Sequence, residues 1–484
     1  MLTLSSILFG FVAVASLPYW LPSALVALRM HIFTGINGEE GISIPGELVD
    51  ASRFKQVYSH PAAKGRSRGA ALSDLFWYWL SPGPEMHQEH LEPGRRYEEV
   101  ARTTRRILVV PRDAAEKLAA ECVSRVIASQ KIREAKLVRL RDLMMPVWAE
   151  FYYELVFGER CPRTARELIV DNANDVVTAL KCCSLRHMEK RHRLTRFLIG
   201  KLQQGNFPHE LPRRLSREEQ ALYLQGTFFN TAVVQMSEAM VHLLMVLAQH
   251  EDVQLRLASD GDEGYLDWVL AETLRIYPLF GISHRITSTP IDVGKEVTIP
   301  AGSVLCFNHS DYHHTGFDNP ECFAPERWEK LSVAESHYIP FGVMANRPCP
   351  AQGLAPVTMK AVVRDMLKCF TFYSSASHTR SIPSRGPCLL VSKPGKCPEW
   401  KRRSVLVYMR LRDRWEDVWR SVIQLILGTY MVWDARRQRL CQRYFEASGD
   451  KDKPTRGRPQ ECLRNVCTKS DHSTAVTMPR AAGK

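Results

Sequence analysis

A stretch of 34 residues, Arg217 to His250, constrains the fold most, because apolar side chains recur nearly all round it at helical spacing. A helix of this kind is buried inside a large domain or inside a bilayer. A bilayer span would exclude most of the polar residues that interrupt it, which are Asn230, Gln235, Ser237, Glu238 and His242. We therefore predict a core helix and a domain large enough to enclose it.

The rest of the chain between its two ends is also mostly helical in pattern. Apolar residues at spacings of three and four predict helices over residues 95–108, 112–130, 146–158, 165–180 and 265–276. Residues 291–314 instead combine β-branched residues with Gly and Pro turns, which predicts short strands in a small sheet. The predicted fold class is mainly α with a small β part.

Glu272 and Arg275 lie three residues apart in a predicted helix, so their side chains can pair on one face. Apolar residues surround the pair, and a buried ion pair needs further hydrogen-bond partners to offset its desolvation. The proline-punctuated turn "FAPERW" offers Arg327 as such a partner.

Cys349 lies in the loop "PFGVMANRPCPAQG", with no second cysteine or histidine nearby. A lone cysteine is often no more than a small buried side chain. The 13 cysteines show no spacing typical of a disulfide framework or of a four-ligand zinc site, so we expect mostly reduced thiols.

Four motifs in this order, "ETLRIYP", the strand-rich segment from His284 to His314, "FAPERW" and the cysteine loop, resemble the cytochrome P450 haem-thiolate monooxygenases, particularly the fungal membrane-bound ones. The resemblance covers roughly residues 217–391. It implies a P450-like fold and haem b, with Cys349 as the iron ligand. A thiolate ligand increases electron density at iron and favours cleavage of the O–O bond.

The resemblance also implies roles for other residues of this sequence. Arg347 and Arg285 match positions that contact the haem propionates, and Phe341 resembles the aromatic residue beside the sulfur. Glu272, Arg275 and Arg327 match the structural triad that holds the cysteine loop.

The sequence departs from the family pattern at the long helix. The places of the family's acid and alcohol, which deliver protons to oxygen, fall on Val234 and Gln235. Gln235 can donate a hydrogen bond but has no proton to relay. We expect Thr231, Asn230 or Gln235 to organise water there, although Thr231 could instead bond only a backbone carbonyl. The cysteine loop also carries one inserted residue, and no Trp-x-x-x-Arg haem contact is visible before the long helix.

The first 28 residues carry no charge, and such a run is long enough to cross a hydrocarbon core of about 30 Å. Arg29 follows the run and no Lys or Arg precedes it, which predicts an uncleaved single-pass anchor with the rest of the chain in the cytoplasm. We divide the chain into an anchor (1–30), a P450-like domain (31–396) and a basic extension (397–484).

The extension carries 19 Lys and Arg against 10 Asp and Glu, a net of +9 out of +13 for the chain. Residues 418–433 suit a helix lying in a membrane interface, or equally an ordinary packed helix. From Asp450 onward the composition predicts disorder. No nucleic-acid-binding motif accompanies the basic residues, so we expect no nucleic-acid partner.

We expect a haem-thiolate monooxygenase in the endoplasmic reticulum membrane that oxidises a lipophilic molecule, a terpenoid or polyketide of fungal secondary metabolism. Its electrons would come from NADPH through a cytochrome P450 reductase. The missing acid–alcohol pair favours an alternative, an isomerase, dehydratase or peroxide-using enzyme. A third reading is a non-catalytic membrane protein whose basic tail binds anionic lipid.

Overall fold

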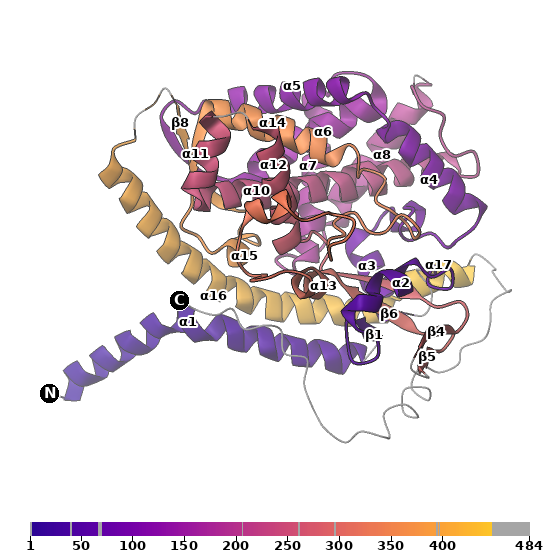
Figure 1. Ribbon diagram of the computed structural model, residues 1–484, viewed down its shortest axis with the longest axis horizontal. Helices are drawn as coiled ribbons and strands as arrows, with labels where there is room; N and C mark the ends of the chain where they lie inside the picture. Colours follow the sequence, from indigo (N-terminus) through magenta and orange to yellow (C-terminus); the bar gives the residue numbers. More distant parts are fainter. Residues whose placement is uncertain are drawn as a thin grey trace.

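The computed structural model describes residues 2–38, 41–65, 70–205, 207–259, 262–294, 297–393, 395 and 397–447, and the predicted disordered tail lies outside this range. Helices dominate the molecule (Figure 1). They are α1 (Leu2–Asn37), α2 (Phe54–Ser59), α3 (Ala71–Leu80), α4 (Arg95–Leu108), α5 (Arg112–Gln130), α6 (Leu140–Phe157), α7 (Arg163–Leu180), α8 (Met188–Gln203), α9 (Arg217–Leu224), α10 (Val233–Gln249), α11 (Glu251–Ser259), α12 (Glu263–Ile276), α13 (His309–Thr315), α14 (Ala355–Cys369), α15 (His378–Ser381), α16 (Glu399–Gln438) and α17 (Leu440–Ala447).

Three small sheets accompany the helices in the described residues. The first has the order β1 (Ile42–Ile44), β6 (Val304–Asn308), β3 (Ile282–Ile286), with β1 parallel and β3 antiparallel to β6. The second is the antiparallel set β2 (Ala135–Arg139), β8 (Pro387–Ser392), β7 (Phe370–Tyr373), and the third pairs β4 (Ile291–Gly294) with β5 (Val297–Ile299). The predicted fold class, mainly α with a small β part, is confirmed.

The long apolar stretch forms one continuous helix from α9 through the π-helical segment η3 (Gln225–Ala232) to α10. It is largely buried, which confirms the predicted core helix. Polar groups inside it have partners on α7 and α8, since Gln225 Nε2 donates to Asn172 Oδ1 at 3.0 Å and Thr195 Oγ1 donates to Gln225 Oε1 at 2.6 Å. Short π-helical segments of this kind are frequent at functional sites.

The main core lies where α10 packs on α6 and α14, and where α5 packs on both α6 and α14. A second apolar cluster joins α2 to the β1–β6–β3 sheet. These two clusters flank the segment that carries Cys349.

The prediction of short strands over residues 291–314 was wrong at the C-terminal end of this segment. The strand pattern stops at Asn308, and residues His309–Thr315 form α13. Asn308 causes the change, because its side-chain oxygen accepts a hydrogen bond from the backbone N–H of Asp311 at 3.2 Å and so caps a helix.

Two described helices are long and apolar enough to cross a membrane, Ser6–Asn37 and Arg217–Gln249. The first is 11% buried and the second 78% buried over their most apolar windows. Only the first has the exposure that contact with lipid requires.

Candidate functional site

Glu272 on α12 is the centre of a buried hydrogen-bond network. Five N–H groups donate to its carboxylate, at distances between 2.8 and 3.1 Å. They belong to Arg275 (two), Arg327, Trp328 and the backbone of Ala324. The helix α12 is therefore joined to the short helical turn η4 (Pro325–Glu329), and the three residues of the predicted triad lie together.

The side chains of Arg275 and Arg327 also lie near the ring of Phe317 and donate to backbone carbonyl oxygens of residues 318–322. Their guanidinium groups lie 4.8 and 5.9 Å from the ring centroid of Phe317. One donor of Arg275, Nη1, is buried without a hydrogen-bond partner. All three guanidinium nitrogens of Arg327 donate hydrogen bonds, so Arg275 is the incompletely bonded member of the group.

The cysteine loop follows directly after this network. The backbone N–H of Cys349 donates to the carbonyl oxygen of Phe341 at 3.0 Å, so the loop closes on itself. Arg347, two residues before the cysteine, has a φ of 51°, a left-handed conformation that non-glycine residues seldom adopt. Burial raises the pKa of the Cys349 thiol to about 11, although a backbone hydrogen bond from Ala351 opposes the effect.

Asn346 fixes the loop to the N-terminal part of the domain, a role the sequence analysis missed. Its Nδ2 donates to the carbonyl oxygens of Tyr58 and Ala63 at 2.7 and 2.6 Å, and the residue is buried. The residue type alone does not predict these hydrogen bonds, because the partners are backbone atoms more than 280 positions away in the sequence.

His313 on α13 is a second missed residue. The backbone N–H of Ile339 donates to its Nε2 at 3.1 Å, and its Nδ1 lies 3.2 Å from the carbonyl oxygen of Arg275. Since Nε2 accepts, the proton lies on Nδ1, which donates a hydrogen bond to the backbone carbonyl oxygen of Arg275. Burial lowers the pKa of His313 to about 3, consistent with a neutral ring that links α12 to the cysteine loop.

The two arginines predicted beside the cofactor lie buried near each other. Arg347 donates to the carbonyl oxygens of Gln88 and Lys64 at 2.7 and 2.9 Å, and Arg285 on β3 contacts Glu89 at 3.2 Å. Burial, followed by repulsion from Arg285, lowers the pKa of Arg347. Nε of Arg285 is buried without a hydrogen-bond partner.

The predicted distal residues lie on η3 and α10. Asn230 is buried, accepts from Asn172 and donates to the carbonyl oxygen of Leu80 at 3.3 Å. Thr231 and Gln235 are half-buried, and no described residue hydrogen-bonds to either side chain, so water can reach both. Val234 is buried and apolar.

Glu238, the acid on α10, does not take the family acid's place. It forms ion pairs with Lys181 at 2.5 Å and with Arg141 at 3.0 Å. Burial alone would raise the pKa of Glu238, but the two cations outweigh it and hold the pKa below its usual range. This carboxylate is engaged in structure and is not a free proton donor.

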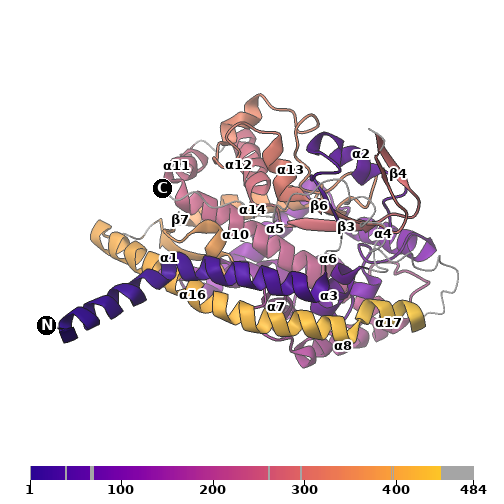
Figure 2. The same cartoon turned by 90° about the horizontal axis from the view of Figure 1, so that it is seen from below.

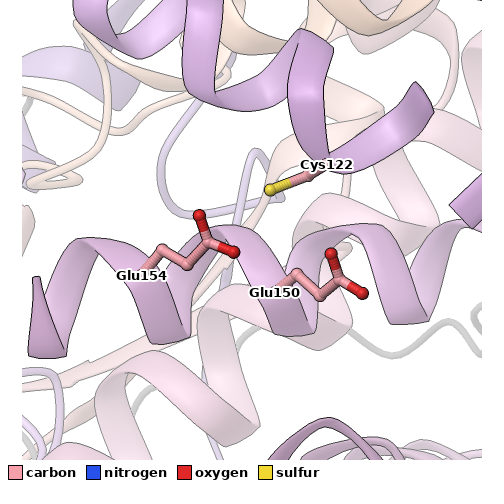
Figure 3. Close-up of side chains that lie close together, drawn as sticks. All are labelled: Cys122, Glu150 and Glu154. Carbon is pink, nitrogen blue, oxygen red and sulfur yellow. The ribbon is translucent and has the colours of Figure 1, made fainter. Parts of the chain in front are cut away.

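Cys122, Glu150 and Glu154 lie together on α5 and α6, away from Cys349 in sequence (Figure 3). Their possible ligand atoms all lie within 4.8 Å of one another. Arg125 contacts both carboxylates at 2.9 and 2.5 Å, and Arg166 contacts Glu150 at 2.6 Å. The arginines already neutralise the acids, so this group is an ion-pair cluster.

Comparison with known proteins agrees with this geometry. The profile of the family "Cytochrome P450" matches residues 163–398. Cytochrome P450 3A9 of Rattus norvegicus is 31% identical over 159 residues, which are 28% of this chain and 31% of the rat protein. The putative cytochrome P450 CYP13A7 of Caenorhabditis elegans is 31% identical over 153 residues, 26% of this chain and 28% of the relative.

Solved structures show the same fold over a larger part of the chain. A retinoic acid-bound cyanobacterial CYP120A1 superposes with a TM-score of 0.56 at 17% identity, covering 71% of this chain and 88% of the other. A zebra fish cytochrome P450 with abiraterone gives 0.54 at 18% identity, covering 65% and 81%.

The chain spans about a third of the length of the curated relatives it matches. The matched residues nevertheless include the long helix, the Glu272 network and the cysteine loop in the order expected. The family implies a haem group with a cysteine thiolate ligand. Residues 163–398 of this chain are thus similar in sequence to the cytochrome P450 family, and its fold is that of solved cytochrome P450 structures.

Proposed function

We propose that this chain is a haem-thiolate monooxygenase that oxidises a lipophilic small molecule, with O2 and electrons from NADPH. The observation that carries the proposal is the fixed position of Cys349, in a loop held by Phe341, by Asn346 and by the adjoining Glu272 network. A ligand to a cofactor needs such support, because surrounding packing and hydrogen bonds must hold it in the productive geometry.

The buried residues fit haem b. Cys349 would supply the thiolate. Burial raises the pKa of its thiol, but a metal ion such as the haem iron favours the deprotonated form of a thiol that binds it. Arg285 and Arg347 would hold the two propionates, since both are buried cations and Nε of Arg285 lacks a partner. When bound, haem supplies the oxidation chemistry, and the protein supplies orientation and protons.

Proton supply rests on the water-accessible groups of η3 and α10. With Val234 and Gln235 in the places of the acid and the alcohol, the protons would come from water organised by Thr231, Gln235 or Asn230, or from a hydroxyl of the substrate. Of the three, Thr231 and Gln235 have free side chains, whereas Asn230 already bonds Asn172 and Leu80.

The substrate class, partner and location are parts of the same proposal. We infer a terpenoid or polyketide of fungal secondary metabolism as substrate and an NADPH–cytochrome P450 reductase as electron donor. The exposed apolar part of α1 supports a single-pass anchor in the endoplasmic reticulum, with the domain facing the cytoplasm.

The test is the carbon monoxide difference spectrum of the reduced protein. Cys349→Ser should abolish the thiolate-type spectrum, because a serine hydroxyl does not replace a thiolate. Cys322→Ser and Cys369→Ser change exposed cysteines and should leave the spectrum intact. A thiolate-type spectrum in Cys349→Ser would refute the assignment.

A second candidate is a haem-thiolate isomerase, dehydratase or peroxide-using enzyme, which needs no proton relay. The apolar Val234 and the engaged Glu238 favour it. Turnover that does not depend on NADPH would select this alternative. Purified protein without haem would instead favour a non-catalytic, lipid-binding membrane protein.

A further inference from the structure

The helix α16 begins at Glu399, one residue after the P450 family match ends, and runs for 40 residues. It lies beside the second half of α1 (Figures 1 and 2). Arg414 donates to the hydroxyl of Tyr19 at 2.6 Å, and Arg29 donates to Gln424 at 3.0 Å. Both pairs are 395 residues apart in sequence, so the two helices run parallel.

One face of α16 packs on the protein. The buried residues of this face include Met409, Ser421, Gly428, Met431, Val432 and Ala435. Met431, Val432 and Ala435 pack with α3 and Cys182, whereas Met409 belongs to the main core. This packing places α16 firmly on the domain.

The opposite face of α16 is apolar and exposed. At 3.6 residues per turn its large apolar side chains fall within an arc of about 140° along about 50 Å of helix. They are Trp400, Val407, Tyr408, Leu411, Trp415, Trp419, Ile426, Tyr430 and Trp433, between 43% and 71% exposed. We call these nine residues the α16 apolar face. A soluble protein seldom leaves such a face uncovered.

Four of the five acids of α16 are buried or half-buried. Asp413 and Asp434 are buried, and Glu416 and Asp417 are half-buried among arginines. The exposed charged residues of the helix are Lys401, Arg403, Arg410, Arg437 and a single acid, Glu399, which pairs with Arg403 at 2.5 Å. The solvent side of the helix is therefore cationic as well as apolar.

The helix α1 continues this surface. Ser6 to Ala15 are all exposed and project from the body of the molecule (Figure 2). In its second half, beside α16, Tyr19, Trp20, Leu28 and Met30 are exposed. The apolar span candidate and α16 therefore lie side by side.

We propose that the α16 apolar face lies in the interface of an anionic phospholipid bilayer, so that α16 is a second membrane contact beside α1. Tryptophan and tyrosine prefer the level of the lipid headgroups, and the neighbouring Lys and Arg attract anionic lipid. A second copy of the chain would also cover an apolar face, but it would bring an equal excess of positive charge. The sign of the exposed charges favours lipid.

The test is flotation of the full-length chain with vesicles. The double change Phe9→Asp and Val12→Asp weakens insertion of α1 into the vesicles. Any vesicle binding that remains is then due to α16. This variant should float with vesicles of phosphatidylcholine and phosphatidylserine in equal amounts, and at least about tenfold less with phosphatidylcholine alone. If it remains in solution with both vesicles, the proposal is wrong.

Trp415→Ser, Trp419→Ser and Trp433→Ser, added together to that variant, should reduce flotation with the mixed vesicles at least about tenfold. The matched control adds Val109→Ser, Leu255→Ser and Val333→Ser, three exposed apolar residues far from α16 in the sequence, and should float as before. Equal flotation of the two triple variants would contradict the proposal. So would a dimer in buffer that the tryptophan changes convert to a monomer, because a second copy would then cover the face.

Circular dichroism verifies that each variant is folded. If the tryptophan variant does not fold, tryptophan fluorescence of the Phe9→Asp, Val12→Asp chain on vesicles with brominated acyl chains takes its place. Trp20→Phe is added to the same chain, so that no exposed tryptophan of α1 contributes to the fluorescence. Quenching is expected, and its absence would overturn the proposal.

Discussion

Nε of Arg327 lies 3.1 Å from Oε1 of Glu272, although 55 residues separate them in the sequence. The contact joins the turn before the cysteine loop to the helix α12. Since the side chain of Glu272 is fully buried, this one carboxylate balances buried positive charge that nothing else in the network neutralises.

Glu272→Ala should destabilise the protein by about 3–5 kcal/mol, because it leaves Arg275 as a buried and unpaired charge. The measurement is the free energy of unfolding in urea together with the amount of haem retained. Arg364→Ala, which removes partly exposed ion pairs with Glu263 and Glu116, is the control and should cost at most about 1 kcal/mol. Similar losses for both variants would contradict the role of Glu272.

Asn346→Asp should loosen the cysteine loop, because a carboxylate cannot donate to the carbonyl oxygens of Tyr58 and Ala63. Leaving these contacts unmade in a buried place costs about 1–3 kcal/mol. We expect faster loss of haem during gel filtration. Met344→Ala, an exposed change in the same loop, should retain haem like the unchanged protein, and equal loss from both would refute this role.

Gln235→Ala should lower product formation by less than about tenfold, which is about 1.4 kcal/mol, if water or the substrate supplies the protons. The measurement is product and hydrogen peroxide formed per NADPH, for the unchanged protein, Gln235→Ala and Thr231→Val. Removing the substrate hydroxyl nearest the oxidised carbon should divert electrons to peroxide. A collapse of coupling in Gln235→Ala alone would show that the glutamine itself organises the relay.

Stability should fall as the pH falls from about 6.5 toward 4, partly because of His242. Burial lowers the pKa of His242 to about 4, and its Nδ1 lies 2.9 Å from Nε2 of His378. As the pH falls, the unfolded chain binds a proton at His242 at a higher pH than the folded chain does. The stability present above about pH 6.5 is therefore lost on acidification. At pH 5 the loss is about 2 kcal/mol.

His242→Gln should flatten this dependence, because the amide keeps a hydrogen-bonding group beside His378 but does not titrate. Urea unfolding across the pH range measures the slope. The exposed His192→Gln is the control and should leave the slope unchanged. An unaltered slope in His242→Gln would rule out this contribution.

The sequence by itself determined the helical class, a core helix predicted over residues 217–250 and the motif around Cys349, because these depend on local periodicity and short motifs. The burial of Glu272 and Arg275 could also be inferred locally, since apolar neighbours at helical spacing surround them. The motif "FAPERW" supplied Arg327 as a partner by residue type alone.

Only the tertiary structure decided which distant groups support these residues. Asn346 bonds backbone oxygens near Tyr58, His313 links Arg275 to Ile339, and Lys181 with Arg141 engages Glu238. It also decided which face of α16 is covered, because the composition of residues 418–433 suits a packed helix and an interfacial helix equally. Local patterns report which side chains must leave water, whereas long-range packing selects their partners, and the energy of a buried polar group depends on that partner.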